Sequence, residues 1–554
     1  MYRSNSNNNS NNNSNSNNNN NSNNNYNRRK FLGHSAAIAS SIALPGISLA
    51  AATPTSGDLL TVGCQNPRTL NPAVQSGNVT GMPGAQLFAG LVLLDAAFQP
   101  VPYLAKSWET SSDGLVYRFN LVENALFHDG RPVTAKDVVF SVNAVKENHP
   151  LMSVTYKVIL ESVAAVGKHT VEIRLKRPFT GLFGLLTPPL TPILPEHVYG
   201  EHAGPLRNNP ANDKPVGSGP YRLLEWQRSA QLRMTRADNF FAGTPFFQNL
   251  AFVLSEDSLS KTLMLEKGEI DYLPFSFLRV TDLSRLESNK NLVLTRKGYD
   301  AIGPINYLEF NLRVKPLDNL LVRQAIAHAI DKNFITSRLH RGLSKPLHGP
   351  FHSDNFYYDE AALQVYDYNL EKANALLDQA GLKPNAQGIR ATFTLDVPTF
   401  EPDSMTLVAD YLKPQLRRVG IDINLRKSSD FASWAKRIGS WDFEMTMNST
   451  FNWSDPAVGV DRSFLSSNIK EQVWTNTAAY ANDQVDQWLA QAAAEADPKA
   501  RKALYAKFQK QVTSDLPFVW TNEGIYVTVY NKKLTNIPMG VFGGLTPYSS
   551  IRYA

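Results

Sequence analysis

The residues whose spacing comes nearest to a known reaction centre are His197, Glu201 and His202. Two histidines and a glutamate on one helix can ligate Zn²⁺ and activate a bound water. In the inverted zinc signature H-x-x-E-H, two residues separate the first histidine from the glutamate, whereas three separate them here. The ten histidines of the chain are otherwise scattered. We therefore predict no metal site and no cofactor.

A second candidate for chemistry is the glycine-rich segment 214–221, Lys-Pro-Val-Gly-Ser-Gly-Pro-Tyr. Glycine-rich loops can cradle phosphate, but a P-loop continues with Lys and Ser or Thr, and this segment does not. It also differs from the nucleophile elbow G-x-S-x-G, because Val216 occupies the place of the first glycine. Its glycines and prolines are typical of a loop. We predict that the chain here returns from an inserted domain to an earlier one.

The chain has one cysteine, Cys64, which excludes internal disulfides and any cysteine-based metal cluster. A lipidated cysteine is one interpretation, but the preceding residues Thr61-Val-Gly63 fit a lipobox poorly, and Cys64 lies well beyond the apolar N-terminal segment. The other interpretation is a buried strand thiol. A first strand is expected over residues 58–63.

Length and charge place the chain among large globular proteins. It has 554 residues, enough for two or three domains with sizeable cores. The net charge is +6, and four of the basic residues lie in the first fifty residues, which contain no acid; without that segment the net charge is +2. No run of Lys and Arg with interleaved aromatics is present. We predict no nucleic-acid partner.

Residues 102–142 form the stretch around which the rest of the chain is organised. Residues 115–121 alternate in the period of a half-buried strand, after a turn at Ser112-Asp-Gly114. Residues 128–132 form a second turn. Thr134 and Asp137 then resemble a capping box, with Asp in place of Glu or Gln, which predicts a helix from about residue 135. By itself, this stretch is a well-packed scaffold without catalytic residues.

The motifs of this stretch, LAKSWE, SDG, YRF, FHDG and TAKDVVFS, resemble in order and spacing the family 5 extracytoplasmic solute-binding proteins. These are the dipeptide-, oligopeptide- and nickel-binding components of ABC importers. Residues 214–221, 307–312 and 322–332 resemble further motifs of the same family. The resemblance covers nearly the whole chain after its N-terminal segment.

The alternation of helices and strands indicates an α/β protein. The resemblance implies a fold like the type II periplasmic binding proteins, with two lobes, a hinge, and a domain II inserted into domain I. The expected ranges are 51–86, 215–305 and 515–554 for domain I, 87–214 for domain II, and 306–514 for domain III. Crossings near Asn306 and Asp515 would form the hinge, and ligand would be enclosed in the cleft when the lobes close.

The resemblance places ligand contacts in residues 441–456. In the family, a loop with Trp and Asp-Pro follows a strand here, and an Asp of that region binds the peptide ammonium in dipeptide binders. We therefore expect Asp455 to bind the ammonium group, with Asn452, Trp453 and Tyr307 as further contacts. Alternatively, Asp455 caps the turn before Pro456, and Trp453 belongs to the core.

The N-terminus has the composition of an export signal. Residues 1–27 are almost all Asn and Ser and have nothing apolar to bury. Arg28-Arg29-Lys-Phe-Leu and a mildly apolar stretch follow, which resembles a twin-arginine signal peptide over residues 1–50. A chance Arg pair is the alternative. We expect export to the periplasm and a mature chain that begins near Ala51.

The main functional hypothesis is a periplasmic binding protein that captures short peptides and delivers them to the permease of an ABC importer. It is expected to be a monomer and not an enzyme. The same fold could instead bind a nickel complex, an oligosaccharide or an opine. A secreted hydrolase is the hypothesis from another class, and the absence of a recognisable elbow, zincin or cysteine motif counts against it.

Overall fold

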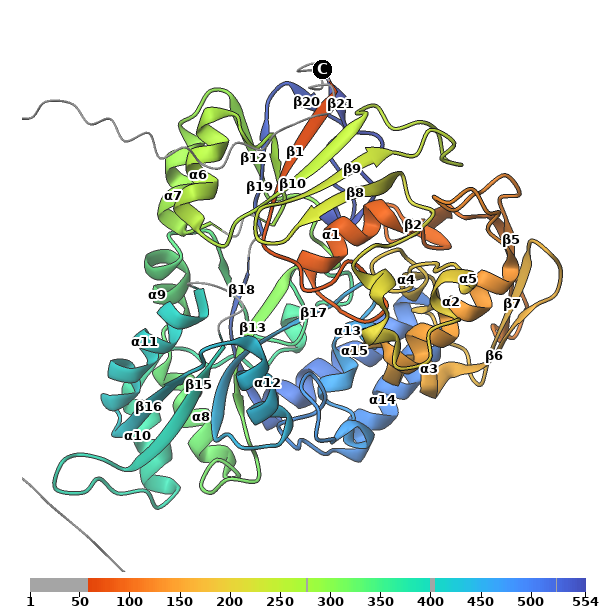
Figure 1. The fold of residues 1–554 in the computed structure, drawn as a ribbon. Helices are drawn as coiled ribbons and strands as arrows, with labels where there is room; N and C mark the ends of the chain where they lie inside the picture. The colour runs from red at the N-terminus through yellow and green to blue at the C-terminus, as the bar shows by residue number, and fades with distance from the viewer. Residues whose placement is uncertain (1–57, 276–277, 399–403, 525) are drawn as a thin grey trace, which may run out of the picture. The chain divides into compact units, whose positions relative to one another are not determined.

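The computed structural model describes residues 58–275, 278–398, 404–524 and 526–554 (Figure 1). The predicted Asn-rich tract and signal segment, and the Arg28-Arg29 pair, lie outside these ranges. Among the helices of the described ranges, none combines the length and apolar character that a membrane span requires.

The first large sheet has seven strands that come from distant parts of the chain, as Figure 1 shows by their colours. Its order is β12-β19-β11-β1-β10-β9-β8. The central strand β1 runs parallel to β10 and β11, while β9, β8, β12 and β19 pair antiparallel. The strands are β1 (Leu59–Cys64), β8 (Tyr221–Gln227), β9 (Gln231–Arg236), β10 (Asn249–Leu254), β11 (Tyr272–Leu273), β12 (Leu292–Thr295) and β19 (Thr528–Asn531). Its accompanying helices are α1 (Asn78–Leu87), α6 (Ser258–Lys267) and α7 (Val280–Glu287).

Cys64 is the last residue of β1 and is 1% exposed. The prediction of a buried strand thiol is therefore confirmed. Burial is the main cause that raises the pKa of this thiol above its ordinary value, which leaves it in the unreactive protonated form.

A second, four-stranded antiparallel sheet has the order β4-β5-β7-β6. In β5, Tyr117, Phe119 and Leu121 are buried and Arg118 is exposed, which confirms the predicted alternation. The elements of this region are β4 (Ala105–Thr110), β5 (Val116–Leu121), β6 (Leu160–Ala165), β7 (Thr170–Leu175), the small pair β2 (Val92–Leu94) and β3 (Pro100–Pro102), and the helices α2 (Ala135–Asn148), α3 (Met152–Ile159), α4 (Leu182–Leu185) and α5 (Glu196–Tyr199).

The predicted capping box is present at the start of α2. The backbone N–H of Thr134 donates to Oδ2 of Asp137 at 2.9 Å, and the Thr134 hydroxyl donates to the same oxygen at 2.8 Å. The other oxygen of Asp137 accepts from the N–H of Glu196 at 3.0 Å. One carboxylate therefore satisfies the helix start and also attaches α5 to α2.

The glycine-rich segment 214–221 packs against the end of α1 and the turn at His128. Nδ1 of His128 accepts from the N–H of Gly217 at 3.2 Å, and its Nε2 lies 3.1 Å from the carbonyl of Gly219. A Cβ on Gly217 would lie 1.9 Å from the Leu87 carbonyl oxygen, and one on Gly219 would lie 2.3 Å from that of Gln86. The glycines are required for this close backbone approach.

A third sheet has six strands in the order β14-β18-β13-β17-β15-β16. Its strands are β13 (Pro304–Phe310), β14 (Lys345–Pro346), β15 (Ala391–Val397), β16 (Ile421–Lys427), β17 (Met445–Phe451) and β18 (Phe518–Glu523). The helices of this part are α8 (Leu320–Ala329), α9 (Lys332–Phe334), α10 (Leu370–Gln379), α11 (Ser404–Arg417), α12 (Phe431–Gly439), α13 (Pro456–Gly459), α14 (Asp483–Ala494) and α15 (Pro498–Asp515). A final short pair joins β20 (Leu534–Thr535) and β21 (Arg552–Tyr553).

Single helical turns complete the description. The 3-10 turns are Leu206–Asn208, Pro210–Asn212, Glu360–Ala362, Asp461–Ser463, Ser466–Asn468 and Gly543–Leu545, and a π-helical turn spans Ile335–Leu339.

The chain passes between the seven- and six-stranded sheets twice, after β12 and after β18. The first passage agrees with the crossing expected near Asn306. The second comes later than the one expected near Asp515, because β18 pairs with β13 from Ile305 to Glu309 and so belongs to the six-stranded sheet. The alternating pattern of this segment predicts a strand but not the sheet that the strand joins.

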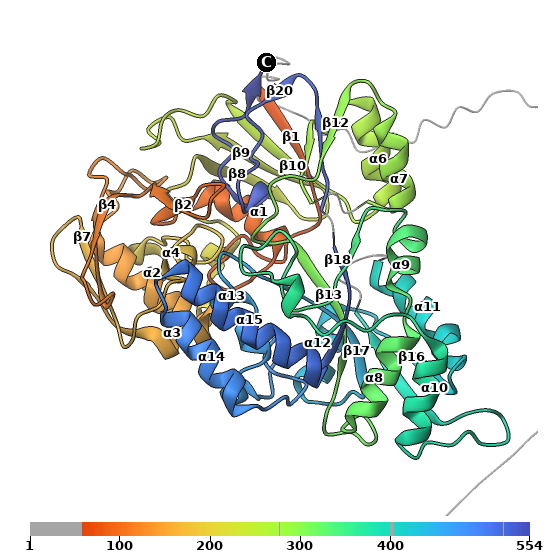
Figure 2. The ribbon, with the colours of Figure 1, turned by 180° about the vertical axis from the view of Figure 1, so that it is seen from behind.

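Helices from two distant parts of the chain lie side by side. In both Figure 1 and Figure 2, α14 and α15 lie next to α2 and α3. Hydrogen bonds connect the two regions: the N–H of Thr180 donates to the Ala493 carbonyl at 3.1 Å, and Nε2 of Gln472 donates to the Pro150 carbonyl at 3.0 Å. These contacts join the region of α2 and α3 to the region of α14 and α15.

Candidate functional site

A cavity of about 460 Å³ lies where the segment after β1 meets the segment after β17. A volume of this size falls in the range of small-molecule sites. One side is formed by residues of the segment 65–80 with Leu151, Glu256 and Tyr526. The other is formed by Asp430, Phe431, Ser449, Thr450, Phe451, Trp453, Arg462 and Trp474.

Aromatic rings form much of the wall. Phe431 and Trp474 stack with their ring centroids 5.2 Å apart, and Phe451 and Trp453 meet edge to face at 5.7 Å. Trp453 and Trp474 both have positive φ, 51° and 60°, a conformation that is uncommon for residues other than glycine. Such conformations persist only where surrounding contacts enforce them, and they concentrate at functional sites.

Several polar atoms of the wall have no hydrogen-bond partner among the residues that the structure describes. They are Oδ1 of Asn78, Oγ of Ser449 and Nε1 of Trp453, and all three are buried. Asn78 already uses its amide nitrogen, which donates to the Tyr526 hydroxyl at 3.2 Å. Because buried polar atoms in proteins are nearly always hydrogen-bonded, these atoms are available to a polar group in the cavity.

Arg462 brings a positive charge into the wall. Its guanidinium donates to the carbonyls of Gly459 and Trp474, both at 2.9 Å, and lies 3.4 Å from the Thr450 hydroxyl. In the described part of the chain, no carboxylate lies within ion-pair distance of it. Burial lowers its pKa to about 10, so the group is charged at neutral pH without a counter-charge. Arg462 keeps part of its surface accessible, as expected for a deep side chain that faces a cavity.

Three more charged residues line the cavity, and all of them are exposed: Arg68, Glu256 and Asp430. Asp430 caps α12, and hydrogen bonds from Ser433 and Ser429 lower its pKa to about 2. Glu256 accepts from the Asn66 N–H at 2.8 Å and from Nε2 of Gln65 at 3.1 Å. The exposed positions thus carry both signs of charge, while the deeper wall carries only the positive charge of Arg462.

Of the four residues predicted to contact ligand, Trp453 lines the cavity. It is also 2% exposed and packs against the core, with its ring 6.5 Å from that of Phe542. The two interpretations of Trp453, cleft wall and core, are therefore not exclusive.

Asp455 does not line the cavity. Its two oxygens accept from the two terminal nitrogens of Arg501, each at 2.6 Å, and Oδ1 also accepts from the Ala457 N–H at 2.9 Å. This last bond is the turn cap that the sequence offered as the alternative role. A contact between Asp455 and a ligand ammonium stays a prediction.

Asn452 and Tyr307 are both buried and lie outside the cavity lining. Oδ1 of Asn452 accepts from the His352 N–H at 3.1 Å, while its Nδ2 has no partner among the described residues. Tyr307 stacks on Phe518 with a centroid distance of 4.3 Å. Burial raises the pKa of the Tyr307 phenol well above its usual value, although the charge of Arg462 acts in the opposite direction. Their roles as ligand contacts stay predictions.

The earlier candidates for chemistry have other partners. Nε2 of His197 lies 2.6 Å from a carboxylate oxygen of Asp129. Within the described ranges, no group of three or more His, Cys, Asp or Glu residues gathers to hold a metal ion.

The sequence patterns do not point to four residues of the cavity wall: Asn78, Glu256, Asp430 and Arg462. Arg462 follows Pro456 in a short turn at Asp461–Ser463, and no motif points to it. These residues share only their position around the cavity, which forms when distant segments of the chain meet. A pattern within a few residues of the sequence could not have identified them.

Residues 99–472 match the family described as bacterial extracellular solute-binding proteins, family 5. The chain belongs to this family. Among its relatives is the probable D,D-dipeptide-binding periplasmic protein DdpA of Escherichia coli (strain K12), which is 28% identical over 487 residues, covering 86% of this chain and 90% of that protein.

Solved structures have the same fold. NikZ from Campylobacter jejuni, in complex with Ni(L-His), superposes with a TM-score of 0.76 at 25% identity and covers 90% of this chain and 98% of its own. The oligopeptide-binding protein AppA from Bacillus subtilis, in complex with a nonapeptide, reaches a TM-score of 0.78 at 23% identity, over 91% of this chain and 100% of its own. The α/β fold of the periplasmic binding proteins, with two lobes joined by a hinge, is thus confirmed. As a family 5 member, the chain is a solute-binding protein for transport.

Proposed function

We propose that this protein binds short peptides in the cavity between its lobes and delivers them to an ABC permease in the inner membrane. The observation that carries the proposal is the cavity itself. It has unpaired polar atoms on Asn78, Ser449 and Trp453, an uncompensated guanidinium on Arg462, and exposed carboxylates on Glu256 and Asp430. A zwitterionic, partly apolar solute complements such a wall.

The names of relatives support a peptide. DdpA is described as D,D-dipeptide-binding, and AppA is bound to a nonapeptide. For the ligand ammonium group, the chain offers Asp455, chosen from its sequence pattern, and the cavity-lining acids Glu256 and Asp430. Trp453 is assigned to the side chains of the ligand, because an aromatic ring accepts diverse apolar groups without strict geometry. Asn452 and Tyr307 are assigned to the surroundings of the same site.

The domain ranges expected from the sequence remain part of the proposal, with domain II at 87–214 inserted into domain I and domain III from 306, except that β18 (Phe518–Glu523) is counted with domain III. The protein is proposed to act as a monomer without catalytic activity. Size-exclusion chromatography with light scattering checks the monomer, and a mass of twice the chain would contradict it.

Native mass spectrometry of protein purified without refolding tests the ligand class, because a co-purified solute shows its mass directly. Masses of di- to pentapeptides, followed by calorimetric titration with those peptides, are the expected result. A nickel complex, an opine or an oligosaccharide would replace the peptide but keep the binding function. Hydrolysis of peptide or ester substrates at enzyme-like rates would overturn the binding function.

We also propose export by a twin-arginine signal in residues 1–50, with the mature chain beginning near Ala51. The support is the Arg28-Arg29 pair before a mildly apolar stretch without acids. Changing both arginines to lysine should leave the precursor in the cytoplasm, as read by fractionation and immunoblotting. Normal appearance of this variant in the periplasm would contradict the assignment.

A further inference from the structure

We propose that His352 is a proton-linked switch at the two passages between the sheets, and that its protonation strengthens the binding of the solute. The inference rests on the proposed function where affinity is measured, while the contacts of His352 stand without it. It goes beyond that function by adding regulation, because pH would then set the balance between the lobe arrangements together with the solute.

The side chain of His352 contacts both passages of the chain between the seven- and six-stranded sheets. The first passage reaches Gly303 just before β13, and a Cβ on Gly303 would lie 2.7 Å from Cδ2 of His352, so the ring packs against this backbone. The second passage begins after Glu523, the last residue of β18, whose Oε2 lies 3.6 Å from Nε2 of His352. The passages also contact each other, because the N–H of Gly524 donates to the Pro304 carbonyl at 2.8 Å. A change of charge on His352 therefore acts where the lobes are connected.

The loop that carries His352 also contacts the wall of the cavity. The backbone N–H of His352 donates to Oδ1 of Asn452 at 3.1 Å, and Asn452 lies between two residues that line the cavity. The N–H of the next residue, Ser353, donates to Oε1 of Glu523 at 2.6 Å. Two neighbouring N–H groups thus connect the cavity wall to the end of β18.

In the neutral ring, Nδ1 is an acceptor. The N–H of Asp354 donates to it at 3.3 Å, so Nε2 carries the proton and faces the carboxylate of Glu523. Glu523 is 1% exposed. In the described part of the chain, no other cationic side chain lies within ion-pair distance of this carboxylate. A buried carboxylate without a counter-charge is costly, which favours a positive charge on His352.

Protonation adds a proton at Nδ1 and gives the ring its charge. Nδ1 then no longer accepts from the Asp354 N–H, but it lies 3.7 Å from Oδ2 of the Asp354 carboxylate and can pair with it. Nε2 becomes the charged partner of Glu523. The protonated ring therefore gains two ion pairs, and one of them holds the loop on β18. Histidine is the side chain that ordinarily changes charge between pH 5 and 8.

The other charged groups around the ring are mostly acidic. Asp300, in the first passage, has a pKa raised by burial and by the charge of Asp354, while His352 acts in the opposite direction. Lys345 of β14 lies 3.8 Å from Oδ1 of Asp354 and is the one cation that competes for these carboxylates among the described residues. Burial raises the pKa of the Tyr358 phenol, near Glu523, to about 12, so this group stays neutral. The balance of charge favours the protonated ring.

The direction of the effect follows from the arrangement that carries these contacts. In this arrangement the cavity is lined both by the segment after β1 and by the segment after β17. Opening of the lobes would change the backbone of the passages and separate the ring from one of them. The enclosing arrangement thus binds the proton more readily. By linkage, the solute binds more tightly as pH falls, until the ring is protonated in both arrangements.

The test measures peptide affinity at pH 7 and at pH 5.5 by calorimetry on the mature protein, freed of co-purified solute by dialysis. The probes are Ala-Ala, Ala-Ala-Ala and any peptide that co-purifies, and the termini of the two alanine peptides keep their charges over this range. The wild type should bind about 3- to 10-fold more tightly at pH 5.5, as expected when two partly exposed ion pairs are gained.

Variants then assign the effect. His352→Gln removes the titrating ring and should bring the affinity ratio between the two pH values to near one. Glu523→Gln keeps an acceptor for the Ser353 N–H but removes the charge, so it should lose most of the gain. His197→Gln is the matched control, because Nε2 of His197 also lies 2.6 Å from a carboxylate oxygen, but His197 belongs to α5 and not to the passages. Its ratio should stay as in the wild type. Titrating groups elsewhere are common to all these proteins and cancel in the comparison.

The outcomes separate this inference from the proposed function. Equal ratios in the wild type and in His352→Gln overturn the switch and leave the peptide function standing. A ratio that is lost in Asp300→Asn but kept in His352→Gln assigns the proton to Asp300 and also overturns the switch.

If no peptide binds, the peptide function falls, and amide hydrogen exchange of the unliganded protein decides on the switch. A protection factor of the Ser353 amide that rises from pH 7 to pH 5.5 in the wild type but not in His352→Gln would support the switch. The same change in both proteins, or no change in either, would overturn it.

Discussion

At the scale of single residues, the carboxylate of Asp455 has two kinds of partner inside the protein. Its carboxylate caps the turn at Ala457 and also forms a bidentate ion pair with Arg501, in which the side chains are 9% and 4% exposed. A buried pair of this geometry is far more sensitive to loss of one partner than a surface pair. A substitution of Asp455 therefore distinguishes its two possible roles. If Asp455 mainly pairs with Arg501, the substitution lowers stability without ligand; if it mainly binds the ligand, the substitution lowers affinity.

Asp455→Asn keeps the shape of the side chain and removes its charge. Because Arg501 is then left buried and unpaired, we expect the free energy of unfolding without ligand to fall by about 3–5 kcal/mol, measured by urea denaturation. The control is Asp213→Asn, which breaks the exposed Asp213–Arg228 pair, 2.7 Å apart, and should cost about 1 kcal/mol or less.

The opposite result would favour the direct role of Asp455. In that case the unliganded variant would be as stable as the wild type, while its peptide affinity would fall about 100-fold. This result would show that Asp455 pairs with the ligand ammonium group instead of with Arg501.

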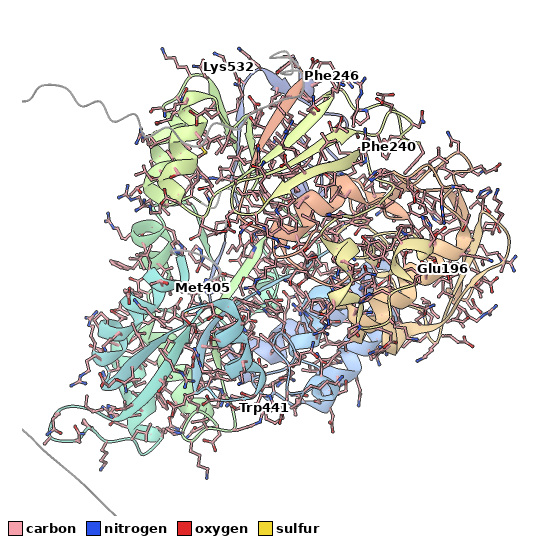
Figure 3. The ribbon with its side chains drawn as sticks, in the orientation of Figure 1. Glu196, Phe240, Phe246, Met405, Trp441 and Lys532 are labelled. Atoms are coloured by element: carbon pink, nitrogen blue, oxygen red, sulfur yellow. The ribbon has the colours of Figure 1, made fainter. Side chains whose placement is uncertain are left out.

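Trp453 should report ligand binding through its fluorescence, because it lines the cavity and its Nε1 lacks a partner among the described residues. We expect peptide to shift or quench the emission of the wild type, and Trp453→Phe to lose most of that change. Trp441→Phe is the matched control. Trp441 also has positive φ, 62° against 51° for Trp453, but lies outside the cavity lining, at the lower edge of the view in Figure 3. A full signal in Trp453→Phe would assign Trp453 to the core alone.

At the scale of elements, the strand β13 places a carboxyl group inside the six-stranded sheet. Glu309 is 1% exposed, accepts from Nδ2 of Asn448 at 2.7 Å and is hydrogen-bonded to the Thr477 hydroxyl. Burial outweighs these bonds and raises its pKa from the ordinary value of 4.5 to about 7. The sheet thus contains a group that titrates near neutral pH.

This group should make stability depend on pH in a defined direction. Between pH 4.5 and 7 the folded state holds a proton on Glu309 that the unfolded chain has released, so stability falls as pH rises through this window. The stabilisation is complete below pH 4.5 and lost above pH 7, and it amounts to about 3 kcal/mol for a shift of this size.

Glu309→Gln removes the titrating group and keeps the shape of the side chain. Urea denaturation at several pH values should show that the wild type loses more stability than the variant between pH 4.5 and 7. Parallel curves for the two proteins would show that Glu309 does not titrate there.

At the scale of the whole described chain, two passages between the sheets leave few connections to resist a hinge motion. The cavity is lined by the segment after β1 and by the segment after β17. The hydrogen bonds from Gln472 to Pro150 and from Thr180 to Ala493 connect the two parts of the chain. A ligand that touches both sides shifts the balance toward the closed form in proportion to its preference for that form.

Small-angle X-ray scattering of the mature chain should therefore show a smaller radius of gyration with saturating peptide than without it. Gln472→Ala removes one contact across the lobes and should enlarge the unliganded radius while leaving the direction of the ligand effect unchanged. An unchanged radius at saturation in the wild type would exclude a large closure.

The sequence by itself determined what depends on near neighbours in the chain. The alternation of residues 115–121 predicted β5, and the Thr134–Asp137 box predicted the start of α2. Each signal acts within a few residues, through side-chain period or through a cap. Ordered motifs extended these local signals to the family and its fold.

Only the tertiary structure decided what depends on residues far apart. It assigned β18 to the six-stranded sheet and paired Asp455 with Arg501. An alternating pattern predicts a strand but not the neighbouring strand with which it pairs. Likewise, a charged residue in a predicted turn does not indicate whether it pairs with another residue or with a ligand. Both depend on which surfaces meet when the chain folds, because charge pairing and burial are properties of distance in space and not of spacing in sequence.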